Sequence, residues 1–450
     1  MFNLLKKSFA LLLVVAMLFT LGACKDKNGD KNDGTSGGQT IQLDAYDLDS
    51  EAIINSMPAE LKGTKIKFLN WYDPMQREEK AVIEAFEQKT GCDVEIIVKT
   101  YGPEYNAALA SFVATGDSPD VIRMLSPKVA NLKSLQPISV TGFDFSDKAW
   151  DKNTETRYTV DGVTYGVNLR YSPFFLPAVL FYNKETIEEY DFEDPYELWK
   201  QDKWTWDKLV EMCEEFVKVK PEHHGLAMLP YGDLPAMTAG LDWMKYDGKQ
   251  YSVDLADAKI LEKWQFALEN KKARVFTESQ DGFDTANQKT LFAAMDATAV
   301  QTSSQYYSKT RRRGKLMGVP APTWGSKADY SVPLIEDLAF GVPIDAPNPK
   351  AVPYFLAYYL DFSNYDTEGT NFFFSEQIKE MYMDLLTVEK RSFNTSQHLM
   401  GAQGGYSNVS IYRNVDPAQL TIWLQEREYI INDTVAQLND TLTKLEKPKK

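Results

Sequence analysis

The chain has 450 residues, of which 44% are hydrophobic and 13% aromatic, so it is too long for one ordinary core and can fill two or three domains or lobes. Its formal net charge of −15 predicts an acidic surface, which disfavours nucleic acid and anionic lipid as partners. The one compact basic run, residues 311–313, has no interleaved aromatic residues and indicates a solvated loop.

The N-terminus reads as an export signal over residues 1–23. Two lysines precede an apolar run at residues 9–21, which is short for a membrane span of about 20 apolar residues. Residues 21–24 read LGAC and resemble a bacterial lipobox. The resemblance implies a lipoprotein whose Cys24 is diacylated and anchors the chain at the outer face of the cell membrane. An ordinary signal peptide with a chance cysteine, or an uncleaved span, is the alternative.

Residues 24–52 are interpreted as a flexible linker, because residues 25–40 are mostly Gly, Asn, Asp, Lys and Ser. We expect order to begin near Ile53. A βαβ pattern follows, with strands and helices in alternation: strands at 66–69, 94–98 and 121–124, and helices at 77–89 and 105–115, ended by Gly91 and Gly116. This pattern predicts a largely parallel sheet, so the loops that start at Asn70 and Leu125 are candidate site loops.

The middle of the chain is predicted to be more helical. The expected helices cover residues 186–190, 206–218, 256–270 and 287–295. A proline-rich connection at 343–353 leads to an apolar helix at 354–362. The tail, residues 417–446, is amphipathic and predicts one long helix or two packed helices.

Several motifs in order resemble one family. They are FEQKTGCDV at residues 86–94, GDSPDV at 116–121, DGVTYGV at 161–167 with LFYNK at 180–184, WTWDKL at 204–209, and AAM at 293–295. The chain thereby resembles the extracellular solute-binding proteins of the large carbohydrate group (family 1, similar to maltose-binding protein), which serve ABC importers. Departures include Asn168 and Trp204 where the family pattern has proline, and a longer insertion at 169–179.

The resemblance implies an α/β, two-lobe periplasmic-binding-protein-like fold of type II, in which each lobe is a mainly parallel sheet flanked by helices and a hinge joins the lobes. The implied N-terminal lobe is 62–168 plus 342–375, and the C-terminal lobe is 176–340 plus 376–450. Cys92 and Cys213 then lie in different lobes, and we expect two free buried thiols, because a bond between them would lock the hinge.

Sugar receptors need aromatic platforms and polar acceptors and donors. Our candidates follow the first strand, lie at the first crossing between the lobes, or lie in later loops: Trp71, Tyr72, Asp73, Asn168, Arg170, Tyr171, Thr302, Ser303, Trp324 and Tyr406. Each has a structural alternative: a capping loop with Trp71 packed in the core, a hinge salt bridge at the crossing, or a plain turn at Thr302 and Ser303.

Enzyme chemistry finds little support in the sequence. The chain has three histidines; His223 and His224 are adjacent, which does not suit metal-ligand spacing, and His398 is alone. We therefore expect no catalytic residue, no metal and no cofactor. The predicted protein is a lipid-anchored monomer that passes a mono- or oligosaccharide to ABC permease subunits and has no nucleic-acid partner. A lipoprotein glycoside hydrolase, or the same receptor fold with a non-sugar solute or a sensor as its partner, is the alternative.

Overall fold

The computed structural model describes residues 48–125, 132–228, 233–277, 289–296, 316–334, 338–367, 373, 375–393 and 415–444. These residues belong to one compact unit, Asp44–Lys450. The export signal, Cys24 and the linker up to residue 47 lie outside the described residues. Described structure includes a helix that begins at Ser50, slightly ahead of the expected Ile53, because the Asp49 carboxylate accepts a hydrogen bond from the Ala52 amide and caps it.

A first five-stranded sheet is built by the N-terminal part of the chain and one returning strand. Its order is β2 (Asp93–Val98), β1 (Lys65–Asn70), β3 (Val121–Leu125), β15 (Leu338–Pro343) and β4 (Leu135–Gln136). β1 runs parallel to β2 and β3, whereas β15 is antiparallel to β3 and β4. The predicted parallel core of this sheet is therefore confirmed, with an antiparallel addition.

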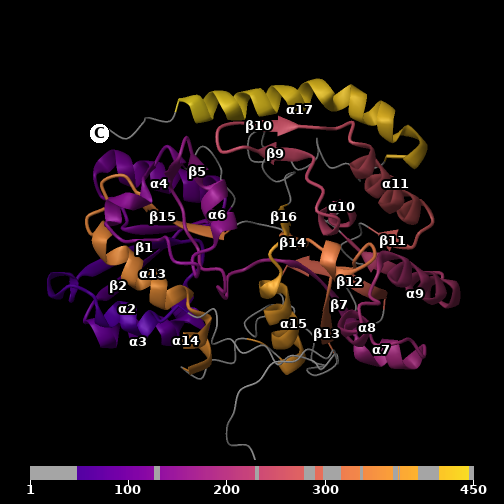
Figure 1. The fold of residues 1–450 in the computed structure, drawn as a ribbon, viewed down its shortest axis with the longest axis horizontal. Helices are drawn as coiled ribbons and strands as arrows, with labels where there is room; N and C mark the ends of the chain where they lie inside the picture. Colours follow the sequence, from indigo (N-terminus) through magenta and orange to yellow (C-terminus); the bar gives the residue numbers. More distant parts are fainter. Residues whose placement is uncertain are drawn as a thin grey trace, which may run out of the picture. The chain divides into compact units, whose positions relative to one another are not determined.

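Helices cover both faces of the first sheet, with α4 on one side and α3 and α13 on the other (Figure 1). The helices here are α2 (Ser50–Asn55), α3 (Glu79–Thr90), α4 (Pro103–Thr115), α6 (Lys152–Arg157), α13 (Val352–Leu360) and α14 (Phe362–Thr367). Gly91 and Gly116 end α3 and α4 in the left-handed conformation, both at φ 71°, as their sequence positions predict. Phe68 joins β1 to α13 through edge contacts with Phe355 and Tyr359.

A second five-stranded sheet forms the other half of the described structure. Its order is β11 (Phe276–Thr277), β8 (His224–Ala227), β12 (Thr290–Asp296), β7 (Ala178–Asn183) and β13 (Leu316–Pro320). β8 is parallel to β11 and β12, and β7 is antiparallel to β12 and β13. Every residue of β7 is buried, which is typical of a central strand.

The prediction of a helix at 287–295 is wrong, because this segment contains strand β12. Leu291 to Met295 are all buried, so both faces of the strand are covered. A short apolar run without polar alternation does not distinguish a buried strand from a buried helix. The hydrogen-bonding partners β7 and β8 on either side decide the outcome.

The second sheet is surrounded by helices that begin at polar caps. They are α7 (Lys184–Glu189), α8 (Pro195–Lys200), α9 (Trp206–Val219), α10 (Leu234–Thr238), α11 (Ala258–Lys272) and α15 (Glu376–Thr387). Thr205, Asp194 and Asp257 accept hydrogen bonds from backbone amides at the starts of α9, α8 and α11. The predicted helices at 206–218 and 256–270 are confirmed as α9 and α11.

Short elements complete the description. They are the two-stranded pairs β5 (Thr159–Val160) with β6 (Val163–Thr164), β9 (Met244–Tyr246) with β10 (Tyr251–Val253) and β14 (Val332–Leu334) with β16 (Arg391–Phe393), and the 3-10 turns η2 (Ala59–Leu61), η3 (Pro74–Gln76), η4 (Ile138–Thr141), η7 (Lys327–Asp329), η8 (Pro349–Ala351) and η9 (Pro417–Gln419). The tail is one helix, α17 (Leu420–Thr443), which lies beside β10 through hydrogen bonds between the Asn439 amide and the Tyr251 backbone (Figure 1).

The chain passes from the first sheet to the second over residues 169–177, and returns between β14 and β15. Isolated bridges pair Val167 with Phe340 at one end of these crossings and Pro177 with Leu334 at the other. This arrangement agrees with a two-lobe α/β fold. The limits of the lobes, 62–168 with 342–375 and 176–340 with 376–450, stay a prediction.

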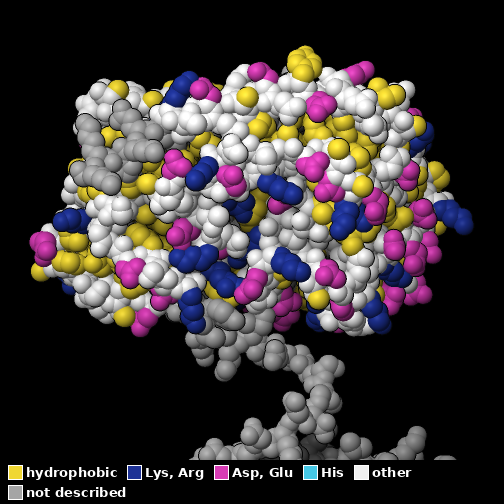
Figure 2. Space-filling model, turned by 45° about the horizontal axis from the view of Figure 1, so that its top comes forward, with side chains coloured by type: hydrophobic (Ala, Val, Ile, Leu, Met, Phe, Trp, Pro, Cys, Tyr) yellow, Lys and Arg dark blue, Asp and Glu magenta, His cyan; other side chains and the backbone are white. Residues whose placement is uncertain are grey.

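Cys92 and Cys213 are both buried and free, as predicted. Burial raises the pKa of the Cys213 thiol well above its usual value. Within the described ranges, no helix is long and apolar enough to cross a membrane. On the face drawn in Figure 2, acidic and basic side chains are interspersed.

Candidate ligand-binding site

The parallel strands of each sheet end at one edge, and ligands of open α/β sheets bind beyond such edges. In the first sheet, β1, β2 and β3 end together, so the segments that start at Trp71, Lys99 and residue 126 follow this edge. In the second sheet, the segments that follow the matching edge start after β8, β11, β12 and β13. Two of these segments, 278–288 and 297–315, lie outside the described residues.

Three aromatic rings gather at the edge of the first sheet, and we call them the aromatic wall: Trp71, Tyr101 and Tyr105. Trp71 meets Tyr101 and Tyr105 edge to face, with ring centroids 5.5 and 5.8 Å apart. Tyr105 is buried, and its hydroxyl is hydrogen-bonded to the backbone oxygens of Leu69 and Arg123, at 2.9 and 2.7 Å. Tyr101 is 44% exposed. The wall therefore combines a fixed base with rings that reach the surface.

Tyr101 was not predicted from the sequence. Its position three residues after the second parallel strand is the signal that could have found it, since that strand ends at the same edge as the first.

The two residues after Trp71 have structural partners. The Asp73 carboxylate accepts a hydrogen bond from the Met75 amide at 2.9 Å and caps η3. The Tyr72 hydroxyl donates to Glu79 Oε1 at 2.5 Å and accepts a hydrogen bond from Arg123 Nη1. Both side chains therefore hold the loop in shape, as the capping alternative expects.

Arg123 is a buried cation below this loop, 4% exposed in the middle of β3. Its guanidinium lies over the rings of Trp71, Tyr72 and Phe174, at 4.8, 4.9 and 4.4 Å from their centroids. Burial raises the pKa of Glu79, while the hydrogen bond from Tyr72 and the charge of Arg123 oppose this rise. Arg123, Tyr72 and Glu79 thus form one buried chain of hydrogen bonds.

The predicted residues at the first crossing make hinge contacts. Asn168 donates from Nδ2 to the Leu338 oxygen at 3.0 Å and accepts from the Leu169 amide at 2.8 Å, so its amide ties the two crossings together. Arg170 pairs with Glu389 at 3.7 Å and lies near the ring of Tyr171, which is buried. These contacts match the hinge alternative.

Trp324 lies in the loop after β13, at the edge of the second sheet. Its indole N–H donates to the Pro235 oxygen at 2.7 Å, and its ring meets Phe266 edge to face at 4.9 Å. Lys263 Nζ lies 3.5 Å from the ring centroid. One ring face is therefore covered by a lysine of α11, and the side chain packs within the second lobe.

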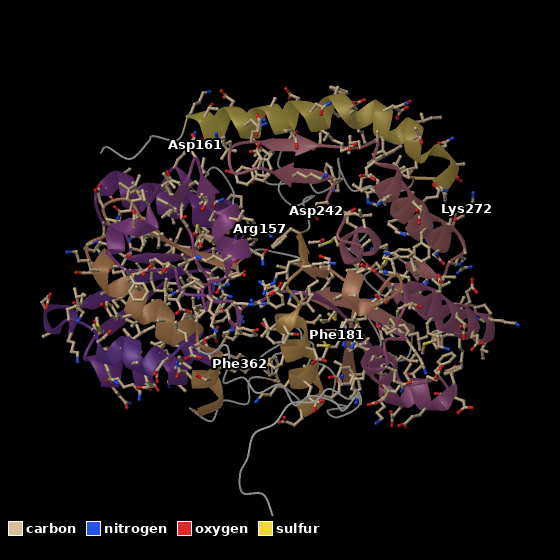
Figure 3. The ribbon with its side chains drawn as sticks, in the orientation of Figure 1. Arg157, Asp161, Phe181, Asp242, Lys272 and Phe362 are labelled. Atoms are coloured by element: carbon tan, nitrogen blue, oxygen red, sulfur yellow. The ribbon has the colours of Figure 1, made fainter. Side chains whose placement is uncertain are left out.

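Two buried acidic residues, Asp233 and Asp242, were missed by the sequence reasoning. Asp233 lies at the start of α10, in the segment that follows β8. Burial raises its pKa to about 6, while the indole groups of Trp264 and Trp243 oppose this rise. Burial also raises the pKa of Asp242 to about 6, opposed by the charge of Arg157 (Figure 3). The place of Asp233 after a parallel strand was an available signal; Asp242 had none.

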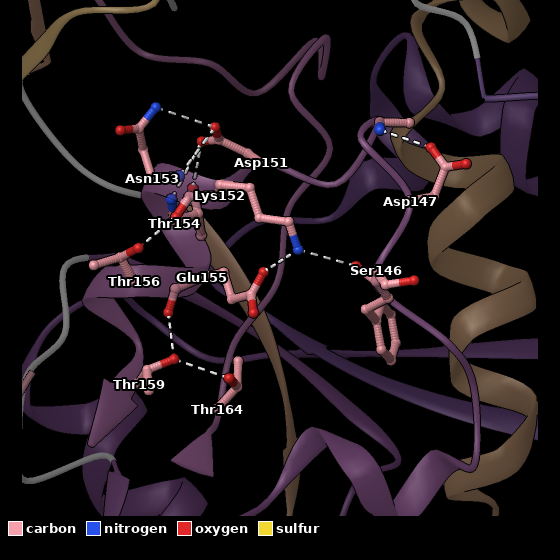
Figure 4. A network of polar contacts seen from close by, with 12 residues as sticks. Ser146, Asp147, Asp151, Lys152, Asn153, Thr154, Glu155, Thr156, Thr159 and Thr164 are labelled. Carbon is pink, nitrogen blue, oxygen red and sulfur yellow. Dashed lines mark hydrogen bonds and ion pairs between the residues drawn. The ribbon is translucent and has the colours of Figure 1, made fainter. Parts of the chain in front are cut away.

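The short helix α6 meets strand β16, of the two-stranded β14–β16 pair, at two points. Asp151 caps α6 by accepting from the Thr154 amide and hydroxyl, within the polar network of Figure 4. Its Oδ2 also accepts from Arg391 Nη1 at 2.8 Å, and these side chains are 8% and 2% exposed. At the other end of α6, Arg157 lies over the Phe393 ring.

Four predicted residues lie outside the described residues: Thr302, Ser303 and Tyr406 of the ligand set, and Cys24. Among the residues that are described, no cluster of three or more His, Cys, Asp or Glu side chains could hold a metal ion.

The family comparison gives one match. Residues 72–361 fit the family model described as bacterial extracellular solute-binding protein, which is more than half of the chain. A comparison with curated proteins gives no match.

Solved structures resemble this fold over most of their length. The sugar-binding protein MalE of Xanthomonas citri has 14% identity and a TM-score of 0.59, covering 85% of this chain and 98% of that chain. The galacto-N-biose- and lacto-N-biose I-binding protein of a Bifidobacterium longum ABC transporter has 15% identity and a TM-score of 0.59, covering 84% and 98%. Maltose-bound MalE3 of T. maritima has 19% identity and a TM-score of 0.52, covering 85% and 100%. At these identities the likeness shows the two-lobe α/β fold alone.

Proposed function

Because this chain belongs to the family of bacterial extracellular solute-binding proteins, we propose that it is the receptor of an ABC importer, which captures a sugar or oligosaccharide and delivers it to the membrane permease. The observation that carries the sugar class is the aromatic wall, with Tyr101 exposed, at the edge where parallel strands end. Apolar sugar faces stack on such rings. The sugar ligands named for the neighbours support the same class.

The proposed ligand set has one part at each sheet. On the first, Trp71 and Tyr101 offer ring faces. On the second, Asp233 is an acceptor at the edge, and Trp324, Thr302, Ser303 and Tyr406 remain proposed contacts. The other predicted residues have a supporting role, in which they fix the loop after β1 and the crossing: Tyr72, Asp73, Asn168, Arg170 and Tyr171.

The proposed mechanism is closure of two lobes around the solute, with no bond made or broken. The ligand favours the closed state by binding it more tightly than the open state. The contacts of Asn168 with both crossings are consistent with bending confined to the crossings. We further propose that the signal at residues 1–23 exports the chain and that Cys24 carries the lipid anchor at the outer face of the cell membrane. We propose a monomer as the working unit.

Isothermal titration calorimetry against a saccharide panel tests the function, with maltose and lacto-N-biose as the first probes. We expect binding to one site and intact saccharide on chromatography afterwards. Hydrolysis of any glycan would instead support a lipoprotein glycoside hydrolase. Binding of only a peptide or polyamine would keep the receptor and reject the sugar.

A further inference from the structure

Two consecutive phenylalanines in the crossing contact arginines on opposite sides. Phe174 lies under Arg123 of the first sheet, with 4.4 Å between guanidinium carbon and ring centroid. Phe175 lies under Arg391 of β16, at 4.5 Å. Phe174 is 1% exposed and also packs on Tyr359 and Tyr365 of the first half, whereas Phe175 packs on Tyr382 of α15. The crossing is therefore held separately by each half of the fold.

Arg123 contacts the loop after β1 with the same guanidinium that covers Phe174. Trp71 and Tyr72 present their rings to it, and Tyr72 accepts a hydrogen bond from Nη1. One planar cation thus joins three rings, two from the candidate ligand loop and one from the crossing. A guanidinium can stack on several rings at once, which an ammonium group does less well.

The position of Arg123 is itself fixed. Tyr72 donates to Glu79 at the start of α3, so the positive charge has a buried acidic partner through one hydroxyl. The backbone of Arg123 is restrained as well, since its carbonyl oxygen accepts a hydrogen bond from the Tyr105 hydroxyl at 2.7 Å. When the crossing moves, Phe174 must therefore shift relative to the Arg123 side chain, which is held in place by these contacts.

We propose that Arg123 is a positioning residue, which couples the arrangement of the Trp71–Tyr72 loop to the crossing at Phe174. Arg123 does not touch the ligand in this role. When the crossing bends as the lobes close, the stack on Phe174 shifts, and the ring platform at Trp71 shifts with it. This part of the inference, the link to ligand capture, rests on the proposed function.

Amide hydrogen exchange in the ligand-free full chain tests the coupling directly. Phe174→Leu removes the ring on the crossing side, and we expect exchange in residues 71–78 to rise about tenfold. Phe175→Leu is the matched control, since it removes the neighbouring ring that faces Arg391, and it should leave residues 71–78 within twofold of wild type.

The reverse experiment changes the arginine. Arg123→Met should raise exchange both in 71–78 and in 169–177, and Arg123→Lys should restore part of the protection. Arg77→Met is the control. Arg77 is exposed and lies over the Tyr72 ring, 4.0 Å from its centroid, but among the described residues it makes no contact with the crossing. It should affect residues 71–78 alone.

A purely structural arginine would give a different result. If Phe174→Leu and Phe175→Leu raise exchange in 71–78 equally, or if all changes follow the fall in melting temperature uniformly, the coupling is refuted. With a saccharide that binds wild type, Arg123→Met should weaken affinity about tenfold and Arg77→Met less than threefold. If no saccharide binds, the proposed function fails, while the exchange results still decide the coupling.

Discussion

Trp71 has its indole against Arg123 and against the edges of two tyrosines, so its local role is partly structural. We nevertheless predict that Trp71→Ala weakens saccharide affinity by about 2 kcal/mol, or about 30-fold, because a stacked aromatic platform is lost. Calorimetry measures this effect. Tyr429→Ala is the control, since Tyr429 is 71% exposed on α17 and should leave affinity unchanged. Equal affinity of Trp71→Ala and wild type would remove Trp71 from the ligand set.

Asp233 has a native pKa of about 6, raised by burial from an ordinary value of 3.8. The native state therefore holds this proton more tightly than the unfolded state, and stability from this group falls as pH rises from about 4 to 6. The unfolding free energy of Asp233→Asn, taken relative to wild type, should therefore rise by about 2 to 3 kcal/mol between pH 4 and pH 7. Thermal unfolding of both proteins across this range measures the difference.

Asp416→Asn is the control of opposite sign. Lys272 lowers the pKa of the exposed Asp416 carboxyl, so its contribution is present at neutral pH and is lost as the pH falls through the native pKa. A wild-type advantage over Asp233→Asn that grows toward pH 7 would contradict the assignment for Asp233.

Helix α9 can pack close to strand β8 because a glycine faces it. Gly225 in β8 lies so close to Cys213 of α9 that an added Cβ would meet the Cys213 side chain and, at 2.7 Å, the Val275 oxygen. We predict that Gly225→Ala destabilises the fold by about 1 to 3 kcal/mol, because the helix must move off the sheet. Gly325→Ala, where an added Cβ meets nothing within 4 Å, should change the denaturation midpoint little.

The contact of α6 with β16 places a buried ion pair between elements of the two halves. Asp151→Asn leaves the Arg391 cation buried without its carboxylate, so we predict a loss of about 3 kcal/mol in unfolding free energy. Chemical denaturation measures it. The control is Glu389→Gln, because Glu389 is 85% exposed in its pair with Arg170 and should cost less than about 0.5 kcal/mol. Equal costs for the two variants would show that the buried pair has no special weight.

At the scale of the whole molecule, the proposed anchor sets where the receptor acts. A receptor tethered by a flexible linker stays near its permease, which raises the effective local concentration. We predict that Cys24→Ser releases a binding-competent protein from the membrane fraction, measured by fractionation and calorimetry on the released chain. A variant that stays with the membrane would mean that Cys24 is not the anchor.

The local elements of this protein were largely predictable from its sequence. The alternating strands and helices from Lys65 to Leu125, the glycines that end α3 and α4, and the helices α9, α11 and α17 follow from periodicity and capping, which act within a few residues. The family motifs, with their order along the chain, predicted the two-lobe α/β fold that the comparisons confirm.

Tertiary structure decided what depends on partners far apart in the sequence. The segment at 290–296 became β12 because β7 and β8 offer hydrogen bonds on both sides. In the sequence, Arg123 is an inconspicuous residue of a strand. Its guanidinium joins Trp71 to Phe174, because the fold brings these three residues together. Local sequence specifies backbone preference, whereas burial, and with it the pKa values near 6 of Asp233 and Asp242, arises only from packing.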